Sequence, residues 1–373
     1  MASAAATPRT DPARPPASPG PHARYLALVR GQTRGLWAAV QRLGLWALSL
    51  PYGLAVRLRN TAYDRGWLRV RRAPVPVVSV GNLTVGGTGK TPCVEYVARY
   101  YRNLGRRVAI LSRGYGAAGG ANDEALLLEE NLPDVPHLQG PDRAALAVTA
   151  VEELDSEVLV LDDGFQHRRL ARDLDLVLID ATIPFGYGHL LPRGLLREPV
   201  SGLRRARVAV LSRCDQVDAA ERGHLRQRLA RIAPAVPLVE ARHRPLELVN
   251  SDRAVEPVER LRGRSVAAFC GLGNPDAFRR TLTDLGAVVA AFRTWPDHHA
   301  YTRQDVDDLR QWAGALPGID AVVTTQKDLV KLRISALGAR PLWAVRIGLE
   351  VDRGQEALDG HLSAALRGGD VVR

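Results

Sequence analysis

The stretch GNLTVGGTGKTP, residues 81–92, has the ending of a phosphate-binding loop but lacks its usual beginning. The usual pattern is G-x-x-x-x-G-K-[ST], and its first glycine would fall at residue 84, where this chain has Thr84. A β-branched run, VPVVSV at 75–80, precedes the stretch, and a segment with helical spacing follows it up to Gly105. The order strand, glycine loop, helix therefore predicts a phosphate-binding loop of a variant type.

The residue types in this stretch suit the binding of a nucleotide. Glycines allow positive φ and a close approach of the backbone, and the N–H groups that begin a helix attract an anion. Lys90 would place a positive charge on the β- and γ-phosphates, and the hydroxyl of Thr91 would bind Mg²⁺. The alternative is a glycine-rich turn before an ordinary helix. The candidates for nucleotide binding are Gly86, Gly87, Thr88, Gly89, Lys90 and Thr91.

The composition limits the class of partner. The chain has 373 residues and a net charge of +11, which favours an anionic partner such as nucleic acid, an anionic membrane or a phosphorylated substrate. A genome that prefers Arg and Ala is the alternative explanation. Aromatic residues make up 5% of the chain and no RNA-binding motif is present, so no nucleic acid is expected. The three cysteines lie far apart, which fits a reducing compartment. No protein partner is inferred.

Two segments precede the loop. Residues 1–22 are rich in Pro, Ala and Ser, and we expect them to be disordered. Residues 23–72 are predicted to form an amphipathic helical segment in which aromatic residues stand among arginines, a composition that suits the headgroup zone of an anionic bilayer. Its longest uncharged run, 43–56, is shorter than the roughly 20 residues of a spanning helix, so contact with a membrane is predicted rather than a crossing. The alternative is a helical pair packed on the core.

The rest of the chain predicts an α/β fold. Apolar runs at 108–112, 158–161, 173–181 and 206–215 are continuous, which is typical of parallel strands buried on both faces. Helical segments lie between several of them. We therefore predict a phosphate-loop NTPase-like open parallel sheet in residues 73–245.

A second, smaller lobe is predicted after this core. The pattern weakens at 234–262, which has the character of a crossing between lobes. Strand patterns then return in SVAAFC, DAVVTT and LWAVRIGLEV, separated by helical segments. Residues 246–373 are accordingly predicted to form a C-terminal α/β lobe, and 23–72 a membrane-facing helical segment in front of the core.

Acidic and polar residues follow the strand predicted at 158–161. Ligands gather at the carboxyl ends of the strands in an open α/β sheet, and a carboxylate there can hold Mg²⁺ directly or through water. Asp162 and Asp163 are therefore metal candidates, of which only one is expected to face the metal; the alternative is a strand-end Asp that caps a turn. Gln166 and His167, on the following turn, would contact phosphate or substrate, or simply hydrogen-bond the loop.

Three further features carry weaker signals. His298 lies in the loop WPDHHAYT, and a kinase that acts on a hydroxyl needs a group to accept or orient its proton, although a loop histidine is more often only solvated. Lys327, at a strand end, would reach a phosphate or lie exposed. The sequence LSRCD at 211–215 matches the guanine-reading motif of GTPases poorly, so guanine specificity is not inferred.

Taken in order, these segments resemble the tetraacyldisaccharide 4′-kinase family, the lipid A 4′-kinases of Gram-negative bacteria. The pair GNLTVGGTGKTP and DDGFQHRRL is highly specific, whereas GGTGKT alone is only moderately so. The family has Thr or Ser at the position of Thr84, so the missing glycine is the family's own departure. The resemblance runs from about residue 35 to 350, and the other matching segments are ILSRGYG, NDEALLL, DLVLIDA, LLPRGLLREP, GLGNPDAF, PDHHAYT and TTQKDLVKL.

The resemblance implies a reaction and a place for it. The γ-phosphate of ATP would pass to the 4′-hydroxyl of an acylated glucosamine disaccharide 1-phosphate, with Mg²⁺ as the metal, at the cytoplasmic face of the inner membrane, where the enzyme would be peripheral. Asp123 and His298 would activate the hydroxyl, although acidic residues such as Asp123 are often only partners of a helix N-terminus. Gln166 and Glu198 would join the site. The metal candidates are then Thr91, Asp162, Asp163 and Glu198, and Gln166 joins the residues that bind the nucleotide.

Two other functions stay open from the residues. A phosphate-loop ATPase or GTPase switch, such as a metallochaperone, would hydrolyse nucleotide without a sugar acceptor. Such switches often carry lysine where this chain has Val85, and no cysteine–histidine metal site accompanies the loop. A membrane-tethered protein with a degenerate loop would bind nucleotide without turnover.

Overall fold

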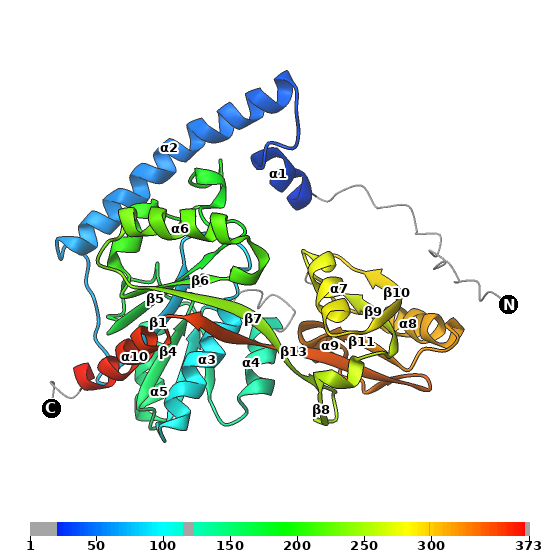
Figure 1. Ribbon diagram of the computed structural model, residues 1–373. Helices are drawn as coiled ribbons and strands as arrows, with labels where there is room; N and C mark the ends of the chain where they lie inside the picture. The colour runs from blue at the N-terminus through cyan, green and yellow to red at the C-terminus, as the bar shows by residue number, and fades with distance from the viewer. Residues whose placement is uncertain (1–20, 115–122, 298, 370–373) are drawn as a thin grey trace. The chain divides into compact units, whose positions relative to one another are not determined.

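The computed structural model describes residues 21–114, 123–297 and 299–369. The chain forms two compact units, each with its own part of the sheet (Figure 1). The predicted tail, 1–22, lies outside the described residues except for its last two, because helix α1 begins at Pro21. Of the described residues, the phosphate-loop unit comprises 21–114, 131–243 and 349–369, and the second unit comprises 123–130, 244–297 and 299–348.

This division differs from the predicted boundaries of 73–245 and 246–373 at two places. The C-terminal helix α10, Gln355–Gly369, returns to the phosphate-loop unit, where the Tyr101 hydroxyl donates a hydrogen bond of 2.8 Å to the carbonyl of Leu362. Residues 123–130 of helix α4, Asp123–Asn131, belong to the second unit, where Glu130 hydrogen-bonds Gln326. Both departures arise from contacts between segments far apart in the chain.

The phosphate-loop unit is built on a parallel sheet in the order β7-β6-β5-β1-β4-β2-β3. Its apolar runs became strands as predicted, and β2 covers the predicted residues 108–112. Strand β1 lies near the middle, so the loop that follows it is placed over the carboxyl edge of the sheet. The strands are β1 Val77–Asn82, β2 Val108–Ser112, β3 His137–Gln139, β4 Val158–Asp162, β5 Leu174–Asp180, β6 Val208–Ser212 and β7 Leu238–Val249.

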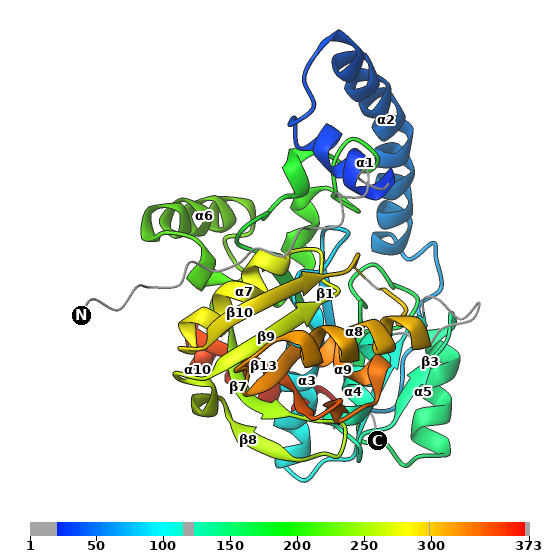
Figure 2. The same cartoon turned by 90° about the vertical axis from the view of Figure 1, so that its right-hand side faces the viewer.

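Helices cover both faces of this sheet (Figures 1 and 2). Helices α5, Arg143–Glu152, and α6, Ala219–Ile232, pack through alanine and leucine on one face of strands β2, β4, β5 and β6. Helix α3, Lys90–Asn103, contacts β1, β2 and β4, and α10 contacts β5. Because alternate residues of a strand point to opposite faces, strands β1, β4 and β5, buried along their whole length, contribute apolar side chains to both layers.

The second unit has its own parallel strands, in the order β10-β9-β11-β13. Strand β7 carries the chain into this unit and β13 carries it back, so the predicted crossing at 234–262 falls on β7. The core of the unit is formed by Phe269, Leu309 and Trp312 with neighbouring aliphatic residues. Its elements are β8 Val255–Pro257, β9 Ser265–Cys270, α7 Pro275–Asp284, β10 Val288–Thr294, α8 Arg303–Ala315, β11 Ala321–Thr325, α9 Gln326–Leu332, β12 Ala336–Leu337 and β13 Arg340–Arg353.

The predicted N-terminal segment is helical. Helix α1 spans Pro21–Val29, and the long helix α2 spans Leu36–Asp64 and contains Pro51. Large apolar side chains stand exposed along α2, with Leu36 84% and Trp37 72% exposed. Within the described part of the chain, no helix has the length and apolar character needed to cross a membrane.

Candidate active site

The phosphate-binding loop joins β1 to α3. Strand β1 ends at Asn82 and α3 begins at Lys90, so the loop delivers its N–H groups to the start of the helix. Gly86 and Gly89 have φ of +107° and +82°, a region that only glycine adopts without strain, and Gly89 caps the helix in the left-handed conformation. The glycines of the motif are therefore required by backbone geometry at these two positions.

The structure explains why Thr84 can replace the first glycine. Thr84 forms an antiparallel bridge with Leu196, in which the Val85 N–H donates to the carbonyl of Leu195 at 2.8 Å and the Arg197 N–H donates to that of Leu83 at 2.8 Å. An extended backbone tolerates a β-branched side chain, and Thr84 is 7% exposed. The segment LLREP thus clamps the start of the loop, and the variant loop does not need a glycine there.

Side chains from β1 and the end of β6 hold the loop in shape. Asn82 Nδ2 donates to Thr88 Oγ1 at 3.0 Å, and Ser212 Oγ donates to the Thr88 carbonyl at 2.9 Å. Arg213 donates to the carbonyl of Gly87 at 2.9 Å while it also pairs with Asp180 at the end of β5. These contacts engage the Gly87 and Thr88 carbonyls, and the Thr88 N–H donates to the Gly86 carbonyl at 3.1 Å. The N–H groups at the start of α3 are then the ones that suit an anion.

Lys90 lies beside the carboxylate that follows β4. Its Nζ is 3.6 Å from Asp163 Oδ1, and Arg197 donates to both Asp163 oxygens at 2.7 and 2.8 Å. Burial alone would raise the pKa of Asp163, but the Lys90 and Arg197 cations outweigh it, so the pKa of this carboxyl is lowered. The carboxylate is therefore ionised at neutral pH and is neutralised by two cations.

Asp162 occupies a different position from its neighbour. It is the last residue of β4, is 7% exposed and pairs in register with Val80 of β1. Asp163 follows with a φ of +54°, which turns it away from the strand direction toward Lys90. The two carboxylates thus face different surroundings, as expected for adjacent residues at a strand end.

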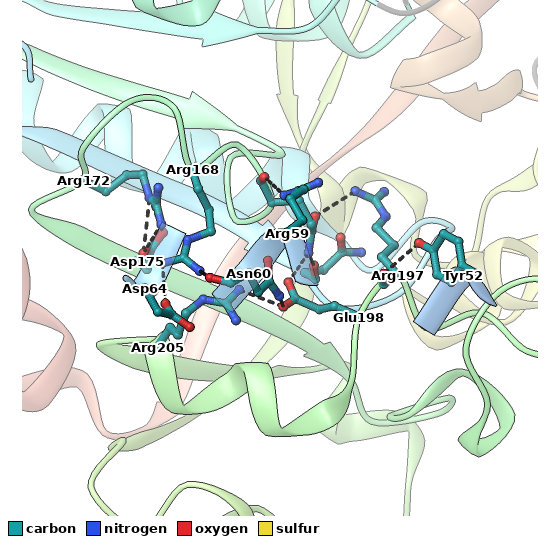
Figure 3. Close-up of polar contacts among 12 residues, drawn as sticks. Tyr52, Arg59, Asn60, Asp64, Arg168, Arg172, Asp175, Arg197, Glu198 and Arg205 are labelled. Atoms are coloured by element: carbon teal, nitrogen blue, oxygen red, sulfur yellow. Dashed lines mark hydrogen bonds and ion pairs between the residues drawn. The ribbon is translucent and has the colours of Figure 1, made fainter. Parts of the chain in front are cut away.

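Gln166 and Glu198 form a second polar group next to the loop, and Figure 3 shows Glu198 with Asn60 and Arg205 beside it. Gln166 Nε2 donates to Glu198 Oε1 and to the Asn82 carbonyl, each at 2.9 Å. The Glu198 carboxylate, 2% exposed, also accepts from Arg205 at 2.8 Å and from Asn60 at 3.2 Å. Three donors therefore hydrogen-bond the buried carboxylate of Glu198. This carboxylate, predicted as a metal ligand, holds the Gln166 side chain beside the end of strand β1.

The C-terminal half of helix α2 contacts this same group. Arg59 donates to the Gln166 carbonyl at 2.5 Å, and the Tyr52 hydroxyl donates to the carbonyl of Arg197 at 2.7 Å. Figure 3 shows Arg59 and Asn60 between Arg205 and Arg197, with Tyr52 beside Arg197 at the end of the row. Direct polar contacts therefore join the exposed apolar helix to Gln166 and Arg197, which in turn donate to the Asn82 and Leu83 carbonyls before the phosphate-binding loop.

The second unit holds Asp123. Lys331, on α9, places its Nζ 2.7 Å from Asp123 Oδ2, and the two side chains are 10% and 14% exposed. His298 lies outside the described residues, so its predicted pairing with Asp123 stays a prediction. Lys327 pairs with Asp297 at 3.2 Å.

Comparison with known proteins identifies the family. The sequence model of the tetraacyldisaccharide-1-P 4′-kinase family matches residues 41–367. The chain belongs to this family. The kinase is 49% identical over 336 residues to the tetraacyldisaccharide 4′-kinase of Anaeromyxobacter sp. (strain K), which covers 85% of this chain and 88% of the relative. It is 39% identical to that of Syntrophus aciditrophicus (strain SB), over 82% and 90% of the two chains.

A solved structure supports the fold of the kinase. The crystal structure of LpxK from Aquifex aeolicus in complex with ATP superimposes with a TM-score of 0.72 at 34% identity, covering 87% of this chain and 99% of the other. The predicted family, the α/β fold class and the prediction of a kinase are therefore confirmed.

The structure brings together most of the predicted site of the kinase and adds residues to it. Arg197 connects four of the predicted residues into one group: Lys90, Asp163, Gln166 and Glu198. Arg197 itself was not predicted, and its place beside Glu198 in LLREP is the sequence feature that could have pointed to it. His243 was not predicted: a β-carbon at residue 89 would lie 2.3 Å from its Nε2, so the imidazole covers Gly89. Its place on β7 depends on strand order, which a single sequence does not reveal.

Proposed function

We propose that the kinase transfers the γ-phosphate of ATP to the 4′-hydroxyl of a tetraacyl disaccharide 1-phosphate, acting as a peripheral protein on the cytoplasmic face of the inner membrane. Membership of the family supports the acceptor, and the ATP named in the Aquifex aeolicus structure supports the donor. The observation that carries the proposal is the phosphate loop with Lys90 held between it and Asp163. No nucleic acid or protein partner enters the proposal.

The loop provides for the triphosphate. The N–H groups of Gly89, Lys90 and Thr91, at the start of α3, would bind the phosphate oxygens, and Lys90 would leave its 3.6 Å pairing with Asp163 for the β- and γ-phosphates. Arg197 would then remain as the counterion of Asp163. A lysine already desolvated and held by one carboxylate has little conformational freedom to lose when the phosphate arrives.

A magnesium ion fits the donors at the edge of this loop. The described residues contain no cluster of three or more His, Cys, Asp or Glu side chains suited to a metal, which matches the habit of Mg²⁺ in kinases of taking one or two protein oxygens and completing its shell with phosphates and water. Thr91, in the first turn of α3, and Asp162, the last residue of β4, would hold it, because a hydroxyl and a carboxylate at the carboxyl edge of the sheet are oxygen ligands of the kind that Mg²⁺ takes in kinases. When bound, the ion supplies charge neutralisation to the transferred phosphoryl group.

The acceptor hydroxyl needs a base, and Asp123 is proposed for this role with His298 beside it. The 4′-oxygen forms a bond to the γ-phosphorus as the bond from that phosphorus to the β–γ bridging oxygen breaks, and ADP leaves. The hydroxyl proton passes to the Asp123 carboxylate. Glu198 and Gln166 would fix the wall of the nucleotide site through Asn82.

Helix α2 is proposed to bring the kinase to its substrate. Its exposed Leu36, Trp37 and Leu43 would enter the boundary between headgroups and acyl chains, while arginines meet anionic lipid. The acyl chains of the substrate could then stay in the bilayer while the sugar reaches the site.

A labelling experiment tests the proposal. The purified protein is incubated with γ-labelled ATP, Mg²⁺ and detergent-dispersed tetraacyl disaccharide 1-phosphate, with Lys90→Ala alongside. Label in the lipid that is absent with the variant would support the kinase. ATP hydrolysis without labelled lipid would overturn the acceptor and favour a nucleotide switch.

A further inference from the structure

Lys331 lies between Asp123, the proposed base, and the loop that contains His299. Its Nζ lies 2.7 Å from Asp123 Oδ2 and also donates to the carbonyl of His299 at 3.2 Å. The Lys331 side chain is 10% exposed and that of Asp123 14%, so the pair is largely shielded from water. One ammonium group therefore ties the first residue of α4 to the loop that follows β10.

Both helices that carry this pair are firmly held. At the other end of α4, Glu130 hydrogen-bonds Gln326 of α9, so the two helices are joined at two places. Helix α9 is capped by Thr325, whose hydroxyl lies 2.6 Å from Asp328, and the buried Asp328 accepts from the Gly271 N–H at 3.1 Å. A lysine on such an element has a defined position, which a site residue requires.

The amino-acid composition is a second observation that bears on Lys331. Among 51 basic residues only three are lysines, Lys90, Lys327 and Lys331, and the rest are arginines. Lysine presents a compact ammonium with three donors, whereas arginine presents a planar fork, so the two side chains are not interchangeable at a site that needs one geometry. Lys90 is such a place in the phosphate loop, and Lys331, which must satisfy a carboxylate and a carbonyl at once, has the same requirement.

We propose that Lys331 is a positioning residue, which holds the Asp123 carboxylate in the orientation that accepts the proton of the acceptor hydroxyl. The inference rests on the proposed function, because it gives Asp123 the role of base. Without the ammonium, the carboxylate at the start of α4 can rotate among its rotamers and turn toward the N–H groups of its own helix. The expected loss is then in turnover and not in substrate binding.

A kinetic cycle tests this role. Lys331→Met keeps the aliphatic stem and removes the charge, and we expect kcat to fall about 10- to 100-fold while KM for ATP and for the lipid changes less than about threefold. Because Lys331 acts through Asp123, the double variant Asp123→Asn/Lys331→Met should be no slower than Asp123→Asn alone. Arg310→Met serves as the control, since Arg310 forms an exposed pair with Asp307 on the surface of the same unit.

The outcomes separate the inference from the function on which it rests. A kcat of Lys331→Met within about twofold of the wild type, or multiplicative losses in the double variant, would overturn the inference. A wild-type protein that does not label the lipid would overturn the proposed function instead.

Spectroscopy gives a readout that does not depend on activity. Protein labelled with ¹³C and ¹⁵N at the lysine side chains should show three signals, one for each lysine, and Lys331→Met assigns the third. Asp123→Asn should shift the Lys331 signal and leave that of Lys327, which pairs with Asp297, in place. An unmoved Lys331 signal would show that the ion pair does not form in solution and would also overturn the inference.

Discussion

The imidazole of His243 lies directly against Gly89, the last residue of the phosphate-binding loop. A β-carbon at residue 89 would come within 2.3 Å of His243 Nε2 and 2.4 Å of its Cε1. The loop therefore approaches strand β7 so closely that only glycine fits, in addition to the φ of +82° that glycine adopts there. Both requirements act at Gly89, the N-cap of helix α3, which begins at Lys90.

This contact predicts that Gly89→Ala destabilises the protein even without nucleotide. The substitution combines positive φ with a clash against a ring, and we expect the free energy of unfolding to fall by about 1–3 kcal/mol in a urea titration. Gly87→Ala is the matched control, since no atom lies within 4 Å of a β-carbon at 87 and its φ is not positive. Equal stability of the two variants would argue that His243 moves away from the loop at little cost.

The same histidine predicts a pH dependence of stability. Burial, followed by the nearby Arg213 cation, lowers the pKa of His243 to about 4, against an opposing effect of Asp180. Burial and neighbouring arginines also lower the pKa of His167 to about 4. The unfolded chain takes up these protons near pH 6.5 and the folded chain only near pH 4, so the contribution of these two histidines to stability is constant above about pH 6.5 and is lost as the pH drops toward 4.

Unfolding titrations at pH 7, 6 and 5 check this dependence. Each histidine contributes a slope of at most about 1.4 kcal/mol per pH unit in this window. His243→Gln should remove the part of this pH dependence that His243 contributes and leave the part that His167 contributes. The lowered pKa of Asp163 acts only below the ordinary value of 3.8, so it leaves this window unaffected. A slope that is the same in wild type and variant would show that the folded protein protonates His243 normally.

Arg197 is predicted to be required for the release of Lys90 to the nucleotide. Arg197→Met would leave Lys90 as the remaining ion-pair partner of Asp163 among the described residues, and the lysine would then be held by the carboxylate. We expect kcat/KM for ATP to fall about 10- to 100-fold, measured as transfer to the lipid. Arg204→Met is the control, because Arg204 is an exposed arginine close in sequence that donates to the Ile232 carbonyl. Its kcat/KM for ATP should stay near the wild-type value. Similar activity of the two variants would place Arg197 outside the nucleotide site.

The parallel sheet was predictable because each of its inner strands is mostly apolar and is buried along its whole length. Strand β2 matches its predicted residues, and β1 begins two residues later than predicted, after Pro76, which has no N–H to donate. The loop was predictable because Gly86, Gly89 and Lys90 sit at fixed spacing beside that strand. These features depend on local sequence.

What the sequence did not reveal depends on contacts between distant residues. Strand order decides that His243 meets Gly89, and the LLREP segment reaches Asp163 across 34 residues of chain through Arg197. The sequence did not tell which of the two aspartates, Asp162 or Asp163, faces Lys90. The answer depends on the backbone conformation, because the positive φ of Asp163 turns its side chain toward Lys90. The return of α10 to the phosphate-loop unit has the same origin, because its partners lie on α3, more than 250 residues earlier in the sequence.

The return of α10 predicts a loss of stability on removal of one hydroxyl. Tyr101 is fully buried, and its hydroxyl is the donor to the Leu362 carbonyl at 2.8 Å. Tyr101→Phe would leave that carbonyl buried and without this donor, at a cost of about 1–2 kcal/mol in the free energy of unfolding. Tyr96→Phe, which removes an exposed contact between Gln355 and α3, should cost less than about 0.5 kcal/mol. Equal effects would show that α10 is not docked through Tyr101 in solution.

Helix α2 predicts binding to anionic vesicles that depends on its apolar face. Leu36 and Trp37 are 84% and 72% exposed, and the transfer of such side chains from water contributes about 1.5–3 kcal/mol each. Leu36→Ser/Trp37→Ser should therefore lower partitioning onto phosphatidylglycerol-containing vesicles about 100-fold, measured by co-sedimentation, with a further decrease in high salt as the arginines are screened. Val288→Ser, at a 58% exposed position of the second unit, should bind as wild type. Unchanged binding of the double variant would mean that α2 covers another surface, and the link from Arg59 to Gln166 would then be a purely structural contact.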